Sequence, residues 1–362
     1  MRGNGRCCSR RARGTAPRMR KSQYNVAIIG ATGTVGRELV AVLDQRGFPL
    51  GSLRLFASAA SAGEENEVAG VRIEELTGDT RLKDTDLVFL ACQETVARVW
   101  RSRALEAGAF VIDLGAGNAG APSMPLVVPE VNAAALARVR EGRLVGSPDP
   151  AAIALAVVLG AVSQIVAIRD VVATVLDPVS LAGRQGIEVL EQELYDLLNG
   201  REPAPPRIFS QRIAFNVVPD VGGGTATLET RGEQVLREHV RLLLGDPGLP
   251  VHATRVQVPV FFGLSIAVDL RLARSVTVHE IESHLQSAPG VLLVASGGEV
   301  QGAPLPLPTP ATVIGSDATH VARVRVDPEV PSVACWLAID NTRKGSATNA
   351  VQIAELLVRD YL

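Results

Sequence analysis

Short apolar segments alternate with amphipathic segments over the first part of the chain. The stretch "YNVAIIGATGTVGRELVAVLDQRG" predicts a strand, a glycine turn and a helix. Further buried strands are predicted in "LRLFA" (Leu53–Ala57), "VRIEEL", "DLVFLA" and "AFVIDL", with a helix over Glu94–Ala107. Apolar strands that alternate with helices are typical of a parallel sheet covered on both faces. We therefore predict an α/β fold that begins with a Rossmann-type, doubly wound nucleotide-binding domain over residues 23–147.

The pattern changes after residue 147. An apolar helix is predicted in "PAAIALAVVLGAV" and a second helix over Gly186–Leu198, and a third lies near Val278–Ala288. The remaining segments are strands typical of a mixed or antiparallel sheet, which indicates an α+β domain over residues 148–340. These strands are "DVVATVLDPVS", "VHATRVQVPVFFG", "SIAVDLRLA", "VLLVA", "HVARVRVD" and "SVACWLAID". Residues 341–362 close the chain with a helix whose apolar positions follow the helical period.

Composition narrows the class of protein. The length of 362 residues predicts about two domains, and 47% hydrophobic with 20% charged residues is typical of a filled globular core. A net charge of -2 favours neither nucleic acid nor an anionic membrane, and no apolar run is long enough to span a bilayer. The four cysteines and five histidines show no disulfide or metal-ligand spacing. We expect a cytoplasmic protein without a metal.

Residues 1–22 form a separate, arginine-rich segment without acidic residues or an apolar core. That composition excludes a secretory signal peptide. A transit peptide, a basic disordered extension, and a start upstream of a natural Met19 remain as alternatives; we favour the latter two.

The glycine turn "GATGTVG" is the first candidate site. Gly30 permits the tight turn, Gly33 allows a phosphate to approach the backbone, and Gly36 allows the helix to pack closely. The free N–H groups of the helix start suit a pyrophosphate. We predict a cofactor contact from the turn, the alternative being a turn kept for packing alone; its candidate residues are Gly30, Thr32, Gly33, Thr34, Val35 and Gly36.

The junction "GSPDPAAIALAVVLGAV" is the second feature of interest. A strand enters the N-terminus of an apolar helix there, which is a favourable place for an anionic nucleophile. The junction holds only Pro148, Asp149 and Pro150, followed by alanines. Asp149 suits an N-cap and Pro150 the first helical position, so the local sequence predicts a well-formed helix start.

Several segments together resemble the aspartate-semialdehyde dehydrogenase family. They are "VAIIGATGTVGRELV", "PLVVPEVN", "RIAFNVVPDVG", "RVQVPVFFGLS" and "DNTRKGSATNAVQIAE", in family order from residue 24 to the C-terminus. The resemblance implies an NADP-binding domain, an α+β catalytic and dimerisation domain, and a final helix that packs on the first domain. It also implies reductive dephosphorylation of aspartyl phosphate, through a cysteine thioester and hydride transfer, by a homodimer.

The resemblance also shows where this chain departs from the family chemistry. Pro150 stands at the family's cysteine, Leu264 at its histidine, and Gln257 at the arginine that holds the substrate carboxylate. Ala119 replaces the phosphate arginine, and Asp177 the active-site glutamine. The family's "EEMK" segment falls near residues 226–229, where Glu229 replaces a lysine. We expect no catalytic residue and no substrate residue at these positions.

The cofactor side departs as well. "CQETVA" replaces a loop of small residues after the fourth strand, and "ASAASAGEEN" after the second strand offers neither an early acid nor a base. NADP or NAD is therefore the implied cofactor, with binding that is weak or lost. Asn341 and Asn349 are candidates for contacts near the nicotinamide.

Two interpretations follow. We favour a non-catalytic, dimeric paralogue with a binding or regulatory role, whose partner is its own copy or a related active dehydrogenase. The alternative is an oxidoreductase that acts on an aldehyde or acyl group with NAD(P) through altered chemistry. Cys92 is a candidate replacement nucleophile, against a role as a buried hydrophobe. Asp149, Asp177 and Glu229 are candidates for an acidic site, against structural roles.

Overall fold

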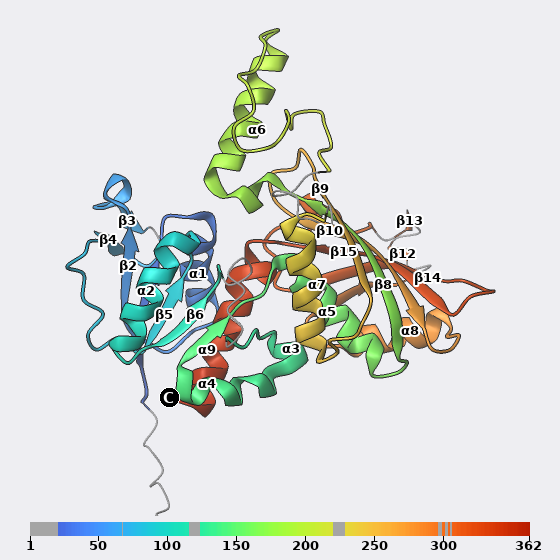
Figure 1. Ribbon diagram of the computed structural model, residues 1–362, viewed down its shortest axis with the longest axis horizontal. Helices are drawn as coiled ribbons and strands as arrows, with labels where there is room; N and C mark the ends of the chain where they lie inside the picture. The colour runs from blue at the N-terminus through green and yellow to red at the C-terminus, as the bar shows by residue number, and fades with distance from the viewer. Residues whose placement is uncertain are drawn as a thin grey trace, which may run out of the picture.

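The chain folds around two sheets that lie side by side, with the C-terminal helix α9 (Thr348–Asp360) between them (Figure 1). The computed structural model describes residues 21–66, 68–115, 124–219, 229–295, 299–300, 303–304 and 306–362. The basic segment predicted at 1–22 therefore lies almost wholly outside the described residues.

The first sheet has seven strands in the order β3-β4-β2-β1-β5-β6-β7. Its pairs are parallel except β3 with β4, which is antiparallel. β3 was not predicted, because it is only two residues long and lies in a loop of small and charged residues. The strands are β1 (Tyr24–Ile29), β2 (Leu50–Ala57), β3 (Glu65–Asn66), β4 (Val71–Glu75), β5 (Leu87–Leu90), β6 (Phe110–Asp113) and β7 (Leu144–Gly146).

Helices cover both faces of this sheet, which confirms the doubly wound arrangement. One face packs against α1 (Thr34–Gln45) and α9 in a common apolar cluster. The other face packs against α2 (Glu94–Glu106) in a second cluster. Two short helices, α3 (Pro129–Asn132) and α4 (Val139–Gly142), precede β7.

The second sheet is mixed, as predicted, with the order β11-β14-β15-β10-β8-β9. β8 pairs in parallel with β9, and β11 with β14, while the pairs along the middle of the sheet are antiparallel. Its strands are β8 (Ile168–Asp177), β9 (Val251–Gln257), β10 (Leu264–Leu272), β11 (Val291–Val294), β14 (Thr319–Val326) and β15 (Ser332–Ile339). A separate pair joins β12 (Glu299–Val300) and β13 (Ala303–Pro304).

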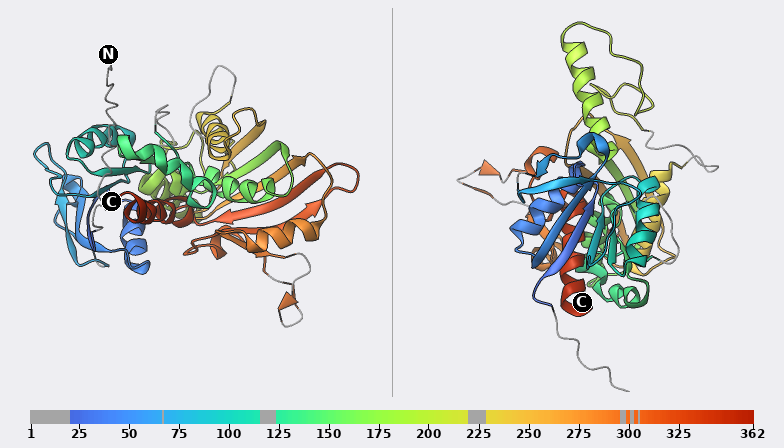
Figure 2. Two further views of the ribbon diagram at one scale, coloured as in Figure 1. Left: turned by 90° about the horizontal axis from the view of Figure 1, so that it is seen from below. Right: turned by 90° about the vertical axis from the view of Figure 1, so that its left-hand side faces the viewer.

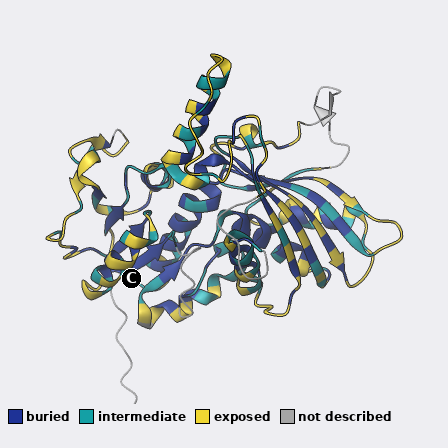
Figure 3. Ribbon diagram, turned by 45° about the horizontal axis from the view of Figure 1, so that its top comes forward, coloured by how far each residue is buried: buried dark blue, intermediate teal, exposed yellow. Residues whose placement is uncertain are grey.

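Three helices pack on one face of the second sheet: α5 (Pro150–Ser163), α7 (Arg231–Leu244) and α8 (Val278–Ser287). α5 is apolar around its whole circumference and is almost entirely buried (Figure 3). Exposed positions alternate with buried ones along the strands, as expected for a sheet with one covered face. α7 was not predicted from the sequence.

A fourth helix, α6 (Gly183–Leu198), projects from the body of the molecule (Figures 1 and 2). It begins three residues before the predicted helix. The proline-rich segment 201–209 runs back along it, and Leu190, Ile213 and Val218 form a small apolar cluster at its base. The arm therefore has its own core, separate from that of the sheet.

The segment before α9 connects the two halves of the molecule. Residues Arg343–Ala347 form a short π-helix, so α9 begins later than predicted. The Arg343 guanidinium contacts Asp317 at 3.0 Å and Glu38 of α1 at 3.2 Å. The Nζ atom of fully buried Lys344 lies 2.5 Å from Oε1 of Glu130 in α3. Ion pairs thus fix the C-terminal segment to both halves.

Among the described residues, no helix is long and apolar enough to cross a membrane, and no cluster of His, Cys, Asp and Glu is suited to a metal ion.

Candidate functional site

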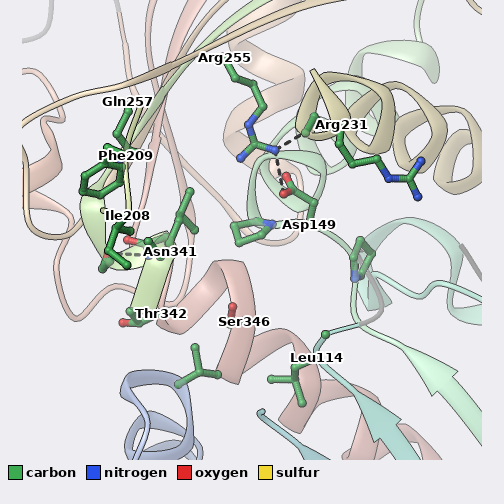
Figure 4. A pocket seen from close by; sticks show the side chains of 18 of the residues that line it. Leu114, Asp149, Ile208, Phe209, Arg231, Arg255, Gln257, Asn341, Thr342 and Ser346 are labelled. Carbon is green, nitrogen blue, oxygen red and sulfur yellow. Dashed lines mark hydrogen bonds and ion pairs between the residues drawn. The ribbon is translucent and has the colours of Figure 1, made fainter. Parts of the chain in front are cut away.

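A pocket with a volume of about 690 Å³ lies between the two halves of the molecule (Figure 4). Its walls come from the α1 start, the turn after β6, the β7–α5 junction, the turn after β8, residues 208–210, the α7 start, β9 and the segment before α9. Residues that the sequence singled out meet here: Val35, Asp149, Pro150, Gln257 and Asn341. The pocket therefore includes the junction where the resemblance places catalysis.

The α5 start has the predicted local structure. Asp149 Oδ1 accepts hydrogen bonds from the backbone N–H groups of Ala151 at 2.9 Å and Ala152 at 3.3 Å. Pro150 is the first residue of the helix. A Cβ atom at Gly345 would lie only 2.9 Å from Pro150 Cβ, so the C-terminal segment passes closely over the proline. The residues of the junction are thus capped and packed as a regular helix start.

Arg255 is the charged centre of the pocket wall, and the sequence analysis missed it. Its guanidinium donates from Nε and Nη2 to the two oxygens of Asp177, at 2.8 and 2.9 Å. It also donates from Nη1 to Asp149 Oδ2 at 2.9 Å. We call these three residues the Arg255 triad. Two carboxylates and one guanidinium leave the triad with one negative charge.

The triad is almost completely buried, which changes the protonation of its members. Burial acts against the charge on Arg255, but the two carboxylates raise its pKa above the ordinary value. Burial also opposes ionisation of Asp149, yet Arg255 holds the pKa of this carboxyl below its usual range. For Asp177, burial raises the pKa, and Arg255 opposes the rise. A bidentate pair in which both Asp177 oxygens accept is the arrangement of an ion pair.

His239 of α7 also contacts the β7–α5 junction. Its Nδ1 atom accepts a hydrogen bond from the backbone N–H of Asp149 at 3.1 Å, so Nδ1 carries no proton. Burial lowers the pKa of His239, and Asp149 opposes this effect. The neutral ring therefore has a structural role at the junction. The positions of the five histidines in the sequence gave no sign of this contact.

The other predicted positions are dispersed. Leu264 is fully buried in the core of the second sheet and does not line the pocket. Glu229 pairs with Arg237 on α7, outside the triad. The acidic site considered for Asp149, Asp177 and Glu229 is thus two carboxylates joined by an arginine. Ala119 lies outside the described residues.

The glycine turn after β1 has the geometry that the sequence predicts. Gly30 adopts a φ of 91°, and a Cβ atom there would collide with the carbonyl oxygen of Ala91. A Cβ atom at Gly36 would collide with the carbonyl oxygen of Gly30. Gly33 is the N-cap of α1 without a side-chain cap, so the first helical N–H groups remain available to an anion. These features fit a pyrophosphate.

A second pocket of about 610 Å³ lies beside this turn. Thr32 and Thr34 line it together with Arg37 and Glu38, and Thr342 lines both pockets. The two pockets are therefore neighbours, one beside the glycine turn and one at the α5 junction.

The side chains near the end of β2, where an acid would favour NAD and a base NADP, include one of each charge. The sequence indicated neither acid nor base early after β2, but the fold brings Arg37 of α1 to this side. Its Nη2 atom lies 3.7 Å from Glu64 Oε2, and both side chains are more than half exposed. A base and an acid are thus available together, and they select neither NAD nor NADP.

Cys92 follows β5 beside the glycine turn, but its environment is unsuited to a nucleophile. Burial, with Asp113 and Glu94 nearby, raises the pKa of the Cys92 thiol to about 12. Arg101 pairs with Asp113 at 2.5 Å and with Glu94 at 3.1 Å, which occupies its charge. Because the thiolate is the reactive form, the raised pKa disfavours a role of Cys92 as a nucleophile.

The two asparagines have different positions. Asn341 lines the larger pocket, where its Oδ1 accepts from the Gly263 N–H at 2.9 Å and its Nδ2 donates to Ser180 at 3.1 Å. Asn349 is fully buried and donates to the Val127 carbonyl and to the Ser147 hydroxyl. These two bonds hold the start of α9 beside the β7–α5 junction, and the contact of Asn349 near the nicotinamide stays a prediction.

The parallel first sheet with its glycine turn, joined to a mixed second sheet, is typical of two-domain dehydrogenases that bind a dinucleotide. Comparisons with known proteins identify the family. Residues 25–139 match the model "Semialdehyde dehydrogenase, NAD binding domain", and residues 159–344 match "Semialdehyde dehydrogenase, dimerisation domain". The chain therefore belongs to the semialdehyde dehydrogenase family.

Individual relatives agree with this assignment. The chain is 37% identical to the USG-1 protein homolog of Azotobacter vinelandii, covering 92% of this chain and 98% of that protein. It is 34% identical to the aspartate-semialdehyde dehydrogenase of Rickettsia bellii, over 94% and 99% of the two chains. It superposes on aspartate semialdehyde dehydrogenase II of Vibrio cholerae, complexed with ASA, with a TM-score of 0.88 and 34% identity, over 94% and 100% of the chains.

The family models bear on cofactor and assembly. The NAD binding domain supports a nucleotide cofactor for residues 25–139, in agreement with the open helix start at Gly33. The dimerisation domain supports the expected homodimer.

Proposed function

We propose that this chain is a catalytically silent, homodimeric member of its family that acts in the cytoplasm by binding rather than by acyl chemistry. One observation carries the proposal: Pro150 occupies the first helical position at the α5 junction, directly on the pocket between the halves. Cysteine, histidine and lysine are absent from the described residues that line this pocket.

The chemistry of the family explains why this observation is decisive for the proposal. A thioester needs a thiolate, and an acid–base group must move the protons. A nucleophile and its base act as a unit, so the loss of the nucleophile alone removes most of the rate. Leu264, at the resemblance position of the histidine, is enclosed in the core and supplies no proton.

A turnover assay tests this proposal. Purified chain is incubated with aspartate semialdehyde, phosphate and NADP, and NADPH formation is followed by absorbance. We expect no rate above that of buffer. A rate that survives repeated purification would overturn the proposal.

The second candidate function is an oxidoreductase that acts on an aldehyde or acyl group with NAD(P). The open helix start at Gly33 and the adjoining pockets favour it. Calorimetry with NADP and with NAD distinguishes the two candidates. Micromolar binding would support the oxidoreductase, whereas weak or absent binding is expected for the silent protein.

Assembly is the remaining part of the proposal. We propose a homodimer, which the dimerisation-domain match supports, and a related active dehydrogenase as the alternative partner. Sedimentation of the purified chain, alone and mixed with an aspartate-semialdehyde dehydrogenase, separates the two assemblies. A monomer under both conditions would contradict both.

A further inference from the structure

The second sheet has one face without a helix among the described residues, because α5, α7 and α8 all pack on the opposite face. Strand alternation sends every second residue of β8, β9 and β10 to the uncovered face, where most of them are exposed. We call the exposed residues of this side the open face. They are Val172, Thr174, His252, Thr254, Ala267, Asp269 and Arg271.

The open face is contiguous and consists mainly of short side chains. Strand register places its residues side by side across the three strands, with Val172 next to Asp269 and Thr174 next to Ala267. Valine, threonine and alanine allow a second sheet to approach to the roughly 10 Å that separates packed sheets. The surface therefore suits another sheet rather than a small ligand.

Two unpaired charges make the open face complementary to itself. Asp269 and Arg271 lie two positions apart on β10, a strand in the middle of the sheet. Among the described residues, neither side chain forms a hydrogen bond or an ion pair. In a two-fold contact, residue i of one copy meets residue j of the other, and j meets i. An acid and a base on the same side of one strand therefore match a second copy of that strand.

The segment after the arm extends the open face beyond the edge strand β9. Val218 forms an antiparallel bridge with Gln257, and its side chain is buried. Gln257 lies on the same side of β9 as Arg255, which contacts the α5 start on the covered face. Alternation therefore places the exposed Val217 on the side of the open face.

Phe215 is presented from the same segment in a strained conformation. Its side chain is 67% exposed, and its φ of 56° is unfavourable for a bulky residue. The turn before it is fixed, because Oε2 of the buried Glu193 accepts hydrogen bonds from the N–H groups of Ile213 at 2.9 Å and Ala214 at 2.8 Å. An exposed aromatic ring on a rigid turn is typical of an anchor residue at an interface.

From these observations we propose that the open face, with Phe215 and Val217 at its edge, is covered by the same surface of a second copy of this chain. In this two-fold dimer Asp269 of each copy pairs with Arg271 of the other. The match to a dimerisation domain over residues 159–344 includes every residue of this surface. The inference rests on the proposed function, because it gives the proposed homodimer its contact surface.

Sedimentation of the full chain with two matched valine variants tests the surface. Val172→Arg places a long charged side chain on the open face, and we expect the dimer dissociation constant to rise about 30-fold or more. Val99→Arg on α2 is the control, since both valines are 48% exposed, and it should dimerise as the wild type does. Circular dichroism checks the fold of each variant. A folded Val172→Arg that dimerises as tightly as the control would overturn the proposal.

Charge reversal tests the pairing without adding bulk to the centre of the face. Asp269→Arg and Arg271→Asp each place like charges opposite one another, so each should weaken the dimer. The double variant restores opposite charges and should recover most of the lost affinity. Single variants that dimerise like the wild type, or a double variant no tighter than the singles, would overturn the pairing.

Phe215→Gly tests the anchor. Glycine adopts a φ of 56° without strain, so the turn is kept while the ring is removed. We expect the dimer dissociation constant to rise about 10-fold or more, with no loss of thermal stability in the monomer. Unchanged dimerisation would exclude Phe215 from the interface.

The outcomes separate this inference from the proposed function. Turnover of the semialdehyde would overturn the silent role whatever the variants do, and a monomeric wild-type chain would contradict the proposed homodimer itself. A wild-type dimer that survives Val172→Arg would overturn only the surface assigned here. A chain that is monomeric alone, and loses its binding to an active dehydrogenase through Val172→Arg, would overturn the second copy as the occupant of the open face.

Discussion

The glycine turn after β1 and the junction after β7 are both strand-to-helix connections at the carboxyl ends of strands of the first sheet, and packing constrains their residues to different extents. At the first, Gly30 and Gly36 are required because a side chain would collide with backbone. At the second, Asp149 and Pro150 satisfy a helix start in which other caps would also serve. Close packing therefore requires glycine at the first connection, whereas the second connection requires only a residue suited to a helix start.

The largest expected effect concerns the charge network that now occupies the second junction. Arg255→Met leaves Asp149 and Asp177 as buried, unpaired carboxylates. We expect a loss of about 3–5 kcal/mol in the free energy of unfolding, measured by denaturant titration. Arg274→Met is the control, because Arg274 forms an exposed pair with Glu280 whose loss costs less than about 1 kcal/mol. Equal losses in the two variants would show that the triad contributes nothing beyond a surface pair.

The packing requirement at the first junction has a smaller expected effect. Gly36→Ala places a methyl group against the carbonyl of Gly30, and we expect a loss of about 1–3 kcal/mol. Gly78→Ala is the matched control, since a Cβ atom there has no neighbour within 4 Å. If Gly36→Ala were as stable as the control, close packing would not explain why the glycine is retained.

The pH dependence of stability tests the contact of His239 with Asp149 at the second junction. Because the pKa of His239 is lowered on folding, the unfolded chain binds more protons as the pH falls below about 6.5. His239 therefore contributes stability at neutral pH that is lost on acidification, with a slope of at most about 1.4 kcal/mol per pH unit. His239→Gln keeps an acceptor for the Asp149 N–H but does not titrate, so the slope between pH 7 and pH 5 should decrease. His279→Gln, at an exposed position, should leave the slope unchanged.

The smallest expected effect is on thiol reactivity beside the first junction. With the pKa of Cys92 raised to about 12, only about one molecule in 10⁴ carries the thiolate at pH 8. Peptide mapping after iodoacetamide treatment should find Cys92 unmodified in the native chain and modified in the denatured chain. Rapid labelling of native Cys92 would make it a candidate nucleophile again.

Much of the fold follows from local sequence patterns, but some elements do not. The strands of the first sheet and the α5 start were predicted because burial and capping are encoded locally. α7 was missed, although Thr230 and Glu233 form a capping box that marks its start. β3 is too short for any periodicity.

The site was less predictable because its contacts are distant in sequence. Arg255 contacts Asp177, 78 positions away, and Asp149, 106 positions away. The alternation of β9 places Arg255 and Gln257 on the same side of the strand, which was a usable signal. It did not indicate which carboxylates the fold brings to Arg255. The separation of Leu264 from the pocket likewise depends on how β10 packs in the core.

The most direct test of the central claim is a search for the covalent intermediate. The chain is incubated with aspartate semialdehyde and NADP in the absence of phosphate, so that any thioester accumulates, and its intact mass is measured beside an active aspartate-semialdehyde dehydrogenase. The account predicts an unchanged mass for this chain and an acyl adduct on the active enzyme. An adduct of the same mass on this chain, mapped to Cys92 or to any other described residue, would contradict it.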